Sequence, residues 1–302
     1  DSPCLKIKPK TCSVKSGALV LNTFGYGGGL WHTWFDRDLG LAGRAVVKTV
    51  DGGLVTKLVR IDRPIARIPN LAIHLTAADE RDKFGPNLHE HCKAIISMAA
   101  SECVDSTSAG EVTDRLHPCL TKLIGAEIGE RPEDIVDLEL QLIDTQKPVI
   151  GGLNDDMLYC GRLDNLCSSY QCARALIDGA MDESDPLAAQ TNVRIALLFD
   201  HEEIGSNSTT GAGSSLFMDT LTLITNRLVR EAGADVSDLH GLLFRSLRKS
   251  YCVSIDMAHA LHPNYTSKHD PEMAPKIHQG LVIKTNANQR YATNSISASL
   301  FR

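Results

Sequence analysis

The sequence predicts an α/β fold with a mostly parallel sheet, and two patterns along the chain predict it. Beyond residue 153, helical and strand patterns alternate, which is typical of a parallel sheet covered by helices. Before residue 153, strand patterns joined by short turns dominate. The 302 residues are 43% hydrophobic, enough to bury the core of one large domain or of two. We therefore place a domain boundary in the loop-like residues 153–159, between the two patterns.

The first strand region covers residues 18–75, where β-type composition prevails. Within it, two apolar runs in residues 45–61 flank Asp51-Gly-Gly53, and an Asp-Gly pair between such runs predicts a hairpin. Residues 71–75 resume an apolar run. Gly27-Gly-Gly29 lies between aromatic residues and lacks the helix start and the following acidic residue of a nucleotide-binding loop. It therefore indicates a turn or a close backbone approach.

Two further patterns complete the N-terminal half. Residues 87–129 are polar with helical spacing, and residues 135–143 alternate apolar and polar as a half-buried strand does. The C-terminal half predicts three helical and three strand segments. The helical segments are residues 165–180, residues 213–232 and the opening of a helix at 295–302; the strands are residues 193–199, 250–255 and 281–284.

Composition and charge exclude several classes of protein. The 31 basic and 37 acidic residues give a formal net charge of −6, and no basic cluster interleaves with aromatic residues, so nucleic acid is not an expected partner. No apolar run reaches the length of a membrane span, so no membrane partner is expected. The nine cysteines are dispersed, odd in number and without a CxxC pair, which favours reduced thiols and a cytoplasmic location. No signal peptide opens the chain, and both ends resemble the edges of an internal fragment.

The candidate chemistry is concentrated in residues 193–206, VRIALLFDHEEIGS, where an apolar strand ends in Glu202 and Glu203. Adjacent carboxylates at the end of a buried strand repel each other, and burial disfavours the ionised form of both. A bound divalent cation removes that cost, because one carboxylate can ligate the metal while its neighbour takes a proton from a metal-bound water. The alternative is an acidic loop at a solvated strand end.

Two more carboxylates are expected near that pair. Asp256 follows the strand 250–255 as the glutamates follow theirs, and sites in open α/β sheets form beyond the carboxyl ends of strands. Asp164 stands just before a helix and offers a third oxygen ligand, although a helix N-cap is the alternative for it. Two divalent cations would share one bridging carboxylate. Catalytic zinc usually also requires imidazole, and no HExxH helix is present, so further ligands must come from elsewhere.

Several motifs, in order over the whole chain, resemble those of the aspartyl aminopeptidases, a family of cytosolic di-metal peptidases that remove N-terminal Asp or Glu. The matching motifs are Asp1-Ser-Pro-Cys-Leu5, Trp34-Phe-Asp-Arg-Asp-Leu39, Arg67-Ile-Pro-Asn-Leu-Ala-Ile-His-Leu75, Gly161-Arg-Leu-Asp-Asn165, Asp200-His-Glu-Glu-Ile-Gly-Ser206, Asp256-Met-Ala-His-Ala-Leu-His-Pro-Asn-Tyr265 and Lys284-Thr-Asn-Ala-Asn-Gln-Arg-Tyr291. The resemblance implies a metallopeptidase domain, residues 1–15 and 154–302, with helices on both faces of its sheet. It also implies that residues 16–153 form an inserted β-rich α+β dimerisation domain.

The resemblance further implies a role for each carboxylate. Asp164 would bridge two divalent metal ions, expected to be Zn²⁺, and Glu203 and Asp256 would each ligate one of them. Glu202 would be the general base, and Asp1 would be the carboxylate that supports a histidine ligand in a His-x-Asp motif. That histidine would precede Asp1 by two residues, and a second would lie beyond residue 302. We therefore expect the 302-residue chain alone to bind metal poorly and to be inactive.

Three more residues are candidates for the substrate site. Lys284 ends an apolar run, where a solvated strand end is the alternative, and its ammonium would pair with the side-chain carboxylate of an acidic substrate. One interpretation of His74 is a core histidine whose ring nitrogens are hydrogen-bonded. The resemblance implies instead that His74 reaches the neighbouring subunit's site and stabilises the oxyanion. Tyr291 is a weaker candidate, with ordinary packing as the alternative. His259 and His262 receive no definite role.

The predicted function is hydrolysis of the first peptide bond of peptides that begin with Asp or Glu, with Glu202 activating a water bound to two metal ions. An aminopeptidase of the same fold that prefers neutral residues, the vacuolar type, is one alternative. A non-catalytic scaffold is another, although Glu202 and Glu203 would then be buried charges retained at a cost without function. The resemblance also implies self-association into dimers and into a dodecamer built from them.

Overall fold

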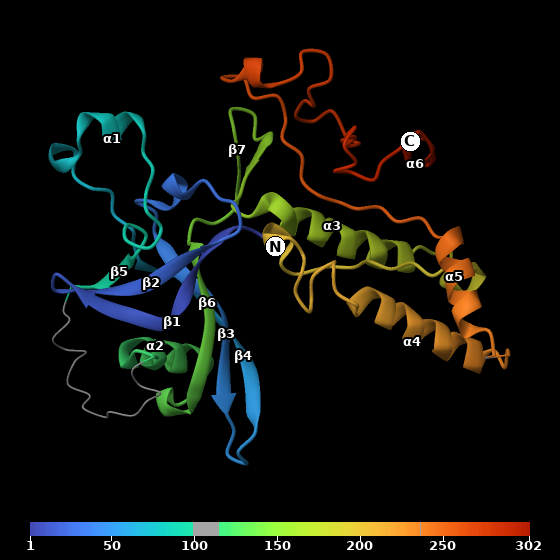
Figure 1. The fold of residues 1–302 in the computed structure, drawn as a ribbon, viewed down its shortest axis with the longest axis horizontal. Coiled ribbons are helices and arrows are strands. Elements are labelled where there is room, and N and C mark those ends of the chain that lie inside the picture. Colours follow the sequence, from blue (N-terminus) through green and yellow to red (C-terminus); the bar gives the residue numbers. More distant parts are fainter. Residues whose placement is uncertain (99–114, 236) are drawn as a thin grey trace. The chain divides into compact units, whose positions relative to one another are not determined.

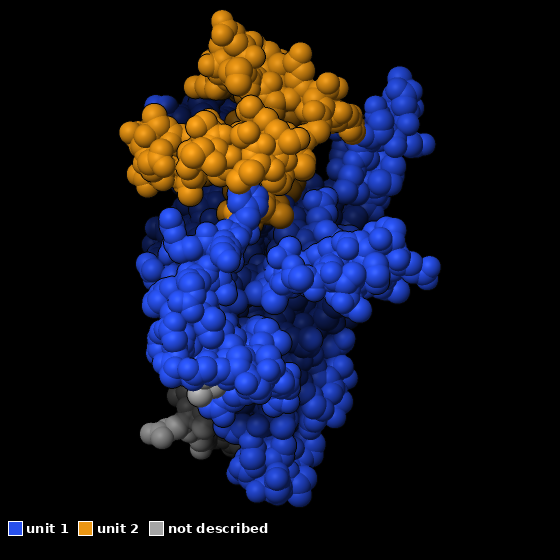
Figure 2. All heavy atoms as spheres, turned by 90° about the vertical axis from the view of Figure 1, so that its right-hand side faces the viewer, with its two compact units in different colours: residues 1–251 blue, residues 252–302 orange. Residues whose placement is uncertain are grey.

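The computed structural model describes residues 1–98, 115–235 and 237–302 as a mixed α/β protein (Figure 1). The chain consists of two compact units, residues 1–251 and residues 252–302 (Figure 2). The strands are β1 (Cys4–Lys15), β2 (Ala18–Tyr26), β3 (Leu39–Lys48), β4 (Leu54–Ala66), β5 (Ala94–Ser97), β6 (Ile135–Asp144), β7 (Val149–Gly151) and β8 (Met157–Tyr159). The helices are α1 (Ala78–Asp82), α2 (Pro118–Ile128), α3 (Leu163–Ala180), α4 (Leu216–Glu231), α5 (Leu239–Lys249) and α6 (Ser295–Phe301).

Six of these strands form one antiparallel sheet in the order β4-β3-β6-β1-β2-β5. The hairpins β1–β2 and β3–β4 supply four of the strands, and β6 joins the hairpins by pairing with both β3 and β1. In the β1–β2 hairpin, Cys4 lies opposite Tyr26. This register places Tyr26, the last residue of β2, beside the first residues of the chain. Strands β7 and β8 form a separate antiparallel pair.

The β3–β4 hairpin confirms the turn predicted at Asp51-Gly-Gly53. The N–H of Thr49 donates to the carbonyl oxygen of Gly53 at 2.9 Å, and Gly52 adopts a φ of +83°. A residue without a Cβ takes that conformation with little strain, which explains why glycine stands here. Strand β6 likewise confirms the strand predicted at residues 135–143.

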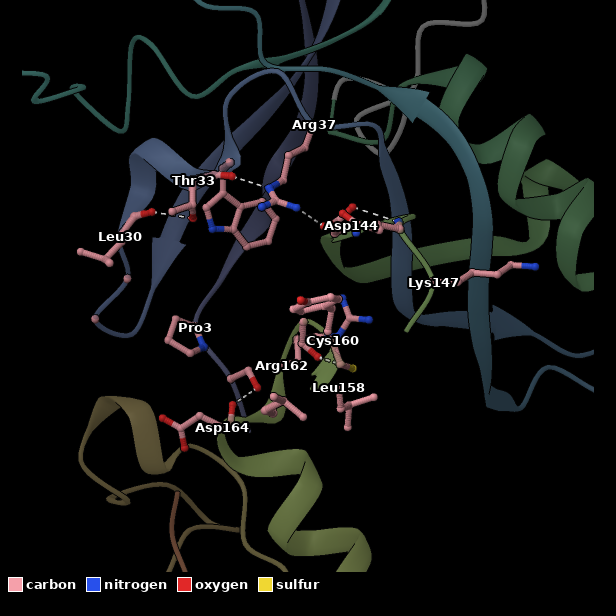
Figure 3. Close-up of a pocket in the computed structure, with 18 residues that line it drawn as sticks. Pro3, Leu30, Thr33, Arg37, Asp144, Lys147, Leu158, Cys160, Arg162 and Asp164 are labelled. Carbon is pink, nitrogen blue, oxygen red and sulfur yellow. Dashed lines mark hydrogen bonds and ion pairs between the residues drawn. The ribbon is translucent and has the colours of Figure 1, made fainter. Parts of the chain in front are cut away.

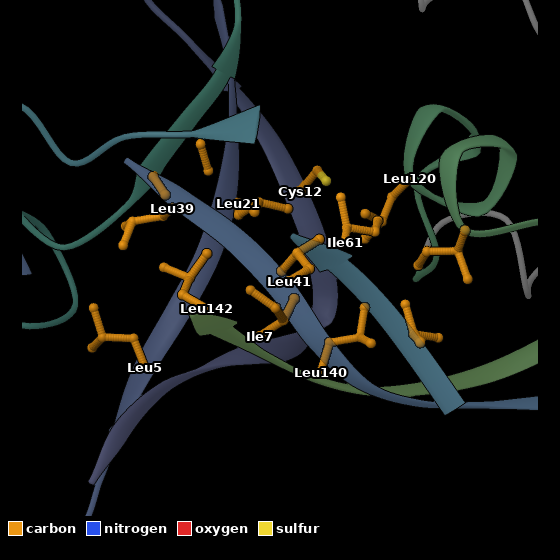
Figure 4. Close-up of a cluster of buried hydrophobic side chains, with 14 of the residues drawn as sticks. Leu5, Ile7, Cys12, Leu21, Leu39, Leu41, Ile61, Leu120, Leu140 and Leu142 are labelled. Carbon is orange, nitrogen blue, oxygen red and sulfur yellow. The ribbon is translucent and has the colours of Figure 1, made fainter. Parts of the chain in front are cut away.

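The hydrophobic core packs the sheet against α2 (Figure 4). The sheet contributes fully buried leucines such as Leu5, Leu41 and Leu142, and α2 contributes Leu120 and Ile124. Burial of one such side chain stabilises a fold by about 1.5–3 kcal/mol, so this cluster holds the sheet and α2 together.

Helix α2 has well-defined ends. At its start, Nδ1 of His117 accepts the N–H of Cys119 at 3.3 Å, and Pro118 occupies the first helical position, where its missing N–H costs nothing. At its end, Gly129 takes a left-handed φ of +70°. The helical pattern predicted for residues 87–129 is thus confirmed at α2 only. Residues 94–97 form the edge strand β5 instead, where Ala94 is fully buried, and residues 99–114 lie outside the described residues.

Beyond residue 153 the predicted helices are present and the predicted strands are not. Helices α3, α4 and α6 confirm the three predicted helical segments, whereas α5 has no counterpart among the predictions. Among the described residues, no strand forms at 193–199, 250–255 or 281–284. A strand needs a neighbour for its N–H and C=O groups, and the strand pairs of the described chain do not include these segments. Their apolar side chains are consequently exposed, as at Val193, which is 62% exposed.

Every strand pair among the described residues is antiparallel, so the mostly parallel sheet predicted for residues 154–302 stays a prediction. The predicted division into residues 1–15 with 154–302 and residues 16–153 also stays one. Its first boundary coincides with the tight turn of the β1–β2 hairpin, so β1 belongs to the same sheet as the strands of residues 16–153.

Two global expectations can be compared with the structure. Of the helices in the described part of the chain, none combines the length and the apolar character needed to cross a bilayer. Seven described cysteines are free thiols, whereas Cys119 is disulfide-bonded. The expectation of reduced thiols therefore holds for those seven and is wrong for Cys119.

Candidate active site

The first residue of the chain lies against the second glutamate of the Glu202-Glu203 pair. Oδ1 of Asp1 accepts the backbone N–H of Glu203 at 3.4 Å. Oδ2 of the same carboxylate accepts the hydroxyl of Tyr26, at the end of β2. Both oxygens of Asp1 are thereby held by segments that are distant in sequence.

The start of α3 is fastened to the same two N-terminal residues. The N–H of Asn165 donates to the carbonyl oxygen of Asp1 at 3.0 Å, and the hydroxyl of Ser2 donates to the carbonyl oxygen of Asp164. Figure 3 shows Asp164 beside this contact. Three predicted site residues, Asp1, Asp164 and Glu203, are therefore brought together within the unit 1–251. Asp164 has extended backbone angles, with a φ of −86° and a ψ of 112°, although α3 is assigned from Leu163. Both interpretations of Asp164, metal ligand and helix cap, therefore stay predictions.

The glutamates lie in a short 3-10 turn, Glu202–Ile204, and not at the end of a strand. His201 precedes it with a φ of +63°, and the N–H of Ser206 donates to the carbonyl oxygen of His201 at 2.9 Å. Nδ1 of His201 also lies 2.7 Å from the hydroxyl of Ser208. A left-handed backbone at a non-glycine residue costs about 1–2 kcal/mol. Such residues cluster at functional sites, and both His201 and Arg162, with a φ of +60°, adjoin candidate site carboxylates.

Several ionisable groups lie near enough to Tyr26 to act on its hydroxyl. Burial, together with the smaller effect of the charges of four nearby groups, raises the pKa of Tyr26 to about 12. Those groups are Cys4, Glu203, Asp200 and Glu202. The hydroxyl therefore stays protonated over the physiological range and can act as a hydrogen-bond donor to Asp1.

Gly27 lies in close contact with Glu203. It adopts a φ of +75°, and a Cβ added to it would stand 2.9 Å from Cβ and 3.4 Å from Oε2 of Glu203. This contact confirms the close backbone approach predicted for the Gly27-Gly-Gly29 run. Any side chain at position 27 would push against the glutamate.

The unit 252–302 contains the remaining acid and the candidate specificity residue. Nζ of Lys284 donates to Oδ2 of Asp256 at 2.7 Å and to the carbonyl oxygen of Met257 at 2.6 Å. The same ammonium lies 5.5 Å from the centre of the Tyr291 ring. Asp256, Lys284 and Tyr291 are thus brought together within this unit.

His74 belongs to a different segment of the unit 1–251. It is exposed on a short 3-10 turn, Ile73–Leu75, in place of the expected apolar strand. In the described part of this unit, no hydrogen bond or ion pair joins it to Asp1, Asp164 or Glu203. Its neighbours Leu71, Ile73 and Leu75 are exposed as well, so His74 is not a core histidine.

A cavity of about 700 Å³ adjoins Asp164 in the unit 1–251 (Figure 3). Asp164 lies at one end of it and Arg37 at the other, where Arg37 forms an ion pair with Asp144 at 2.5 Å. Trp34 and Tyr159 supply aromatic lining. This volume is within the usual range for small-ligand sites, so there is room for a bound molecule beside Asp164.

The carboxylates fit a divalent cation by their chemistry. Oxygen donors suit such ions, and the combined charge of Asp200, Glu202 and Glu203 acts on one hydroxyl, that of Tyr26. Among the described residues, however, three or more His, Cys, Asp or Glu side chains are not gathered in a ready metal-binding arrangement. The donors present in the sequence therefore suit a metal ion, and the assembled coordination set stays a prediction.

Sequence reasoning missed Tyr26 and His201. Tyr26 lies in a strand with ordinary β composition, and no local pattern distinguishes it from a core residue. His201 lies within the quoted acidic motif, so its position beside the glutamates was the available signal.

Comparisons with known proteins identify the family of the chain. The model of the family described as aminopeptidase I zinc metalloprotease, M18, matches residues 1–302. A probable aspartyl aminopeptidase of Ricinus communis is 43% identical to this chain, and the match covers 100% of this chain and 64% of that protein. The aspartyl aminopeptidase of Aspergillus oryzae is 45% identical, with 98% of this chain and 62% of its own length covered.

Solved structures give the same result. A chain in the cryo-EM structure of the Ape4 and Nbr1 complex superposes with a TM-score of 0.88 at 39% identity, covering 99% of this chain and 56% of that one. The chain therefore spans less than two thirds of the length of the relatives it matches. The match over all 302 residues and these identities lead to one conclusion: the chain belongs to the M18 family of aminopeptidase I zinc metalloproteases.

Proposed function

We propose that the protein containing this chain is a cytosolic metal-dependent aminopeptidase that removes N-terminal Asp or Glu from peptides. The observation that carries the proposal is the convergence of Asp1, Asp164 and Glu203 from three distant segments of a chain in the M18 family. The relatives that are 43% and 45% identical are named aspartyl aminopeptidases, which supports the acidic specificity.

Asp164, Glu203 and Asp256 are the residues of this chain that would hold the metal ions, with Asp164 shared between two of them. When bound, two zinc ions would lower the pKa of water and polarise the scissile carbonyl as Lewis acids. Asp1 would orient a neighbouring histidine ligand through its carboxylate, as carboxylates commonly do behind metal-bound imidazole. The assignment of these four roles rests on the family resemblance and on the contacts of Asp1.

Glu202 is proposed as the general base. It takes the proton of the attacking water and then gives it to the amine that leaves when the peptide bond breaks, so one carboxylate serves both steps. Its exposed position on the Glu202–Ile204 turn leaves it accessible to water and substrate. The neighbouring Glu203 is less exposed and is held through its backbone by Asp1.

Lys284 is proposed to select acidic substrates. An ammonium has three N–H donors, and Asp256 and the carbonyl of Met257 accept two of them. The third can donate to the side-chain carboxylate of an N-terminal Asp or Glu, a charge-assisted hydrogen bond that a neutral side chain cannot form. Tyr291, whose ring faces the same ammonium, would line this position.

His74 is proposed to act across a subunit interface. It stands on an exposed turn between Ile73 and Leu75, whose side chains are 56% and 71% exposed. Adjacent exposed apolar side chains favour burial against a protein partner. Self-association would place His74 at the neighbouring subunit's site, where its imidazole stabilises the developing oxyanion.

Substrate profiling of the full-length protein tests this function. Peptide analogues that begin with Asp, Glu or Leu should be compared by kcat/KM, with zinc content measured on the same samples. We expect cleavage of the Asp and Glu substrates and about two metal ions per chain. Preference for Leu would favour the neutral-specific alternative, and absence of both metal and cleavage would favour the non-catalytic scaffold.

A further inference from the structure

The end of strand β2 touches two candidate site carboxylates at once. Tyr26 donates its hydroxyl to Oδ2 of Asp1, and the next residue, Gly27, lies against the side chain of Glu203. These contacts connect the six-stranded sheet with residues 1 and 203, all within the unit 1–251. Neither Tyr26 nor Gly27 belongs to the acidic motifs.

Tyr26 is fixed in place from several sides. It is only 8% exposed, pairs with Cys4 in the sheet and carries Nζ of Lys6 at 4.6 Å from its ring centre. Its ring also meets that of His201 edge-on, with centroids 6.1 Å apart. A side chain so constrained presents its hydroxyl in one direction, and that direction is the carboxylate of Asp1.

Gly27 constrains Glu203 in a different way. Because a Cβ at position 27 would stand 2.9 Å from Cβ of Glu203 and 3.5 Å from Cα of Pro3, the glycine is required by the contact as well as by its φ of +75°. Gly17, in the turn of the β1–β2 hairpin, has a similar φ of +79° but open space where a Cβ would be. A substitution at Gly17 therefore introduces backbone strain alone, whereas the same substitution at Gly27 introduces backbone strain and a clash with Glu203.

We propose that the end of β2 positions the carboxylates of the metal site. The Tyr26 hydroxyl fixes the orientation of the Asp1 carboxylate, and Gly27, which has no Cβ, leaves the space that the Glu203 side chain occupies. Tyr26 is a positioning residue, since it acts on the metal through Asp1. The proposal deepens the proposed function and rests on the roles assigned there, Glu203 as a metal ligand and Asp1 as the carboxylate that orients a histidine ligand. It makes the sheet a structural part of the metal site.

Tyr26→Phe in the full-length protein tests the hydroxyl, with Tyr170→Phe as the matched control because Tyr170 is exposed on α3. Zinc affinity of the metal-free proteins would be measured by competition with a chelator, and kcat and KM by substrate cleavage. Removal of residues that orient metal ligands commonly costs 10–100-fold in affinity or activity, and we expect a zinc Kd about 10-fold higher in Tyr26→Phe. The expected fall is in kcat, with KM for the peptide nearly unchanged.

Gly27→Ala, compared with Gly17→Ala, tests the contact with Glu203. Both variants place a Cβ at a left-handed φ, so both should lower the melting temperature of the metal-free protein, and Gly27→Ala should lower it more because its Cβ also meets Glu203. Only Gly27→Ala should also weaken zinc binding. The positioning role is wrong if two results are found together: Gly27→Ala and Gly17→Ala bind zinc with equal affinity, and Tyr26→Phe and Tyr170→Phe do as well.

The outcomes separate this inference from the proposed function. A wild-type protein that cleaves acidic substrates, with zinc affinity unaltered in Tyr26→Phe and Gly27→Ala, would overturn the inference alone. A wild-type protein that binds zinc but cleaves no acidic substrate, with affinity lost in these variants, would overturn the substrate assignment and support the inference. A lower melting temperature in Tyr26→Phe with unchanged zinc affinity would show a merely structural tyrosine and would also overturn the inference.

Discussion

Nζ of Lys284 and Oδ2 of Asp256 form an ion pair at 2.7 Å within the unit 252–302. One partner is a proposed metal ligand and the other a proposed specificity residue, so the two proposed roles belong to neighbouring side chains. A change at either residue must therefore be read out through both metal binding and substrate preference.

Lys284→Ala should raise KM for substrates that begin with Asp or Glu while leaving zinc content nearly unchanged. Loss of one hydrogen bond to a charged group costs about 2 kcal/mol, equivalent to roughly a 30-fold rise in KM. Steady-state kinetics with Asp and Leu substrates, together with metal analysis, measure this. Lys268→Ala removes an exposed lysine from the same unit and serves as the control. An acidic preference that survives in Lys284→Ala would refute the specificity role.

Glu202→Gln should abolish turnover and retain the metal. The amide keeps the shape of the side chain but cannot accept a proton at neutral pH, and loss of general base catalysis typically lowers kcat by 10²–10⁴-fold. Metal content and kcat on the same preparation decide the matter. Loss of metal along with activity would mean that Glu202 is the ligand and Glu203 the base.

His74→Ala and Glu202→Gln should complement each other when mixed under conditions that exchange subunits. Each homo-oligomer lacks one proposed component of every site. A mixed oligomer regains sites in which His74 comes from one subunit and Glu202 from another, because the two residues would act across the interface. Activity of the mixture above that of either variant alone is the expected outcome. If mixing restores nothing while subunit exchange is verified, His74 does not act in trans.

Leu41→Ala should destabilise the protein by about 2–5 kcal/mol, because Leu41 is fully buried in the core shared by the sheet and α2. Leu58→Ala, at a leucine 84% exposed on β4, should change stability by less than about 0.5 kcal/mol. Urea unfolding of the two variants measures the difference. Equal effects would mean that Leu41 is not a core residue in solution.

Acid should weaken the N-terminus of α2. Burial lowers the pKa of His117 below its ordinary value of 6.5, so the folded state holds the neutral ring and binds fewer protons than the unfolded chain. The stability this contributes is present above pH 6.5 and is lost as pH falls through the lower folded-state value. His117→Asn keeps a side-chain cap without a titrating group, so its unfolding free energy should fall less between pH 7.5 and 5. An identical pH dependence in wild type and variant would contradict this.

The elements that sequence could predict are those with local causes. The Asp51-Gly-Gly53 turn follows from glycine conformation, and β6, α3 and α4 follow from hydrophobic periodicity. The strand predicted at residues 193–199 is absent from the described part of the chain, because apolar composition alone does not determine which segment would pair with it.

The site shows the same division. The acidic turn at Glu202 and Glu203 stands in one short motif and could be found by inspection. The contact between Asp1 and Glu203 spans 202 residues, and no local pattern encodes it. Tyr26 was missed for this reason: its importance comes from the residue it meets, which only the fold determines.

The large sequence separations in the site have a consequence for the order of folding. The β1–β2 and β3–β4 hairpins join neighbouring segments, so each can form by closing a short loop. The contacts of Asp1 with Asn165 and Glu203 instead require loops of more than 160 residues to close. The carboxylates can thus meet only after the chain between them has become compact. A folding intermediate with formed hairpins would consequently have no competent site, and metal binding in a refolding experiment should appear after the sheet.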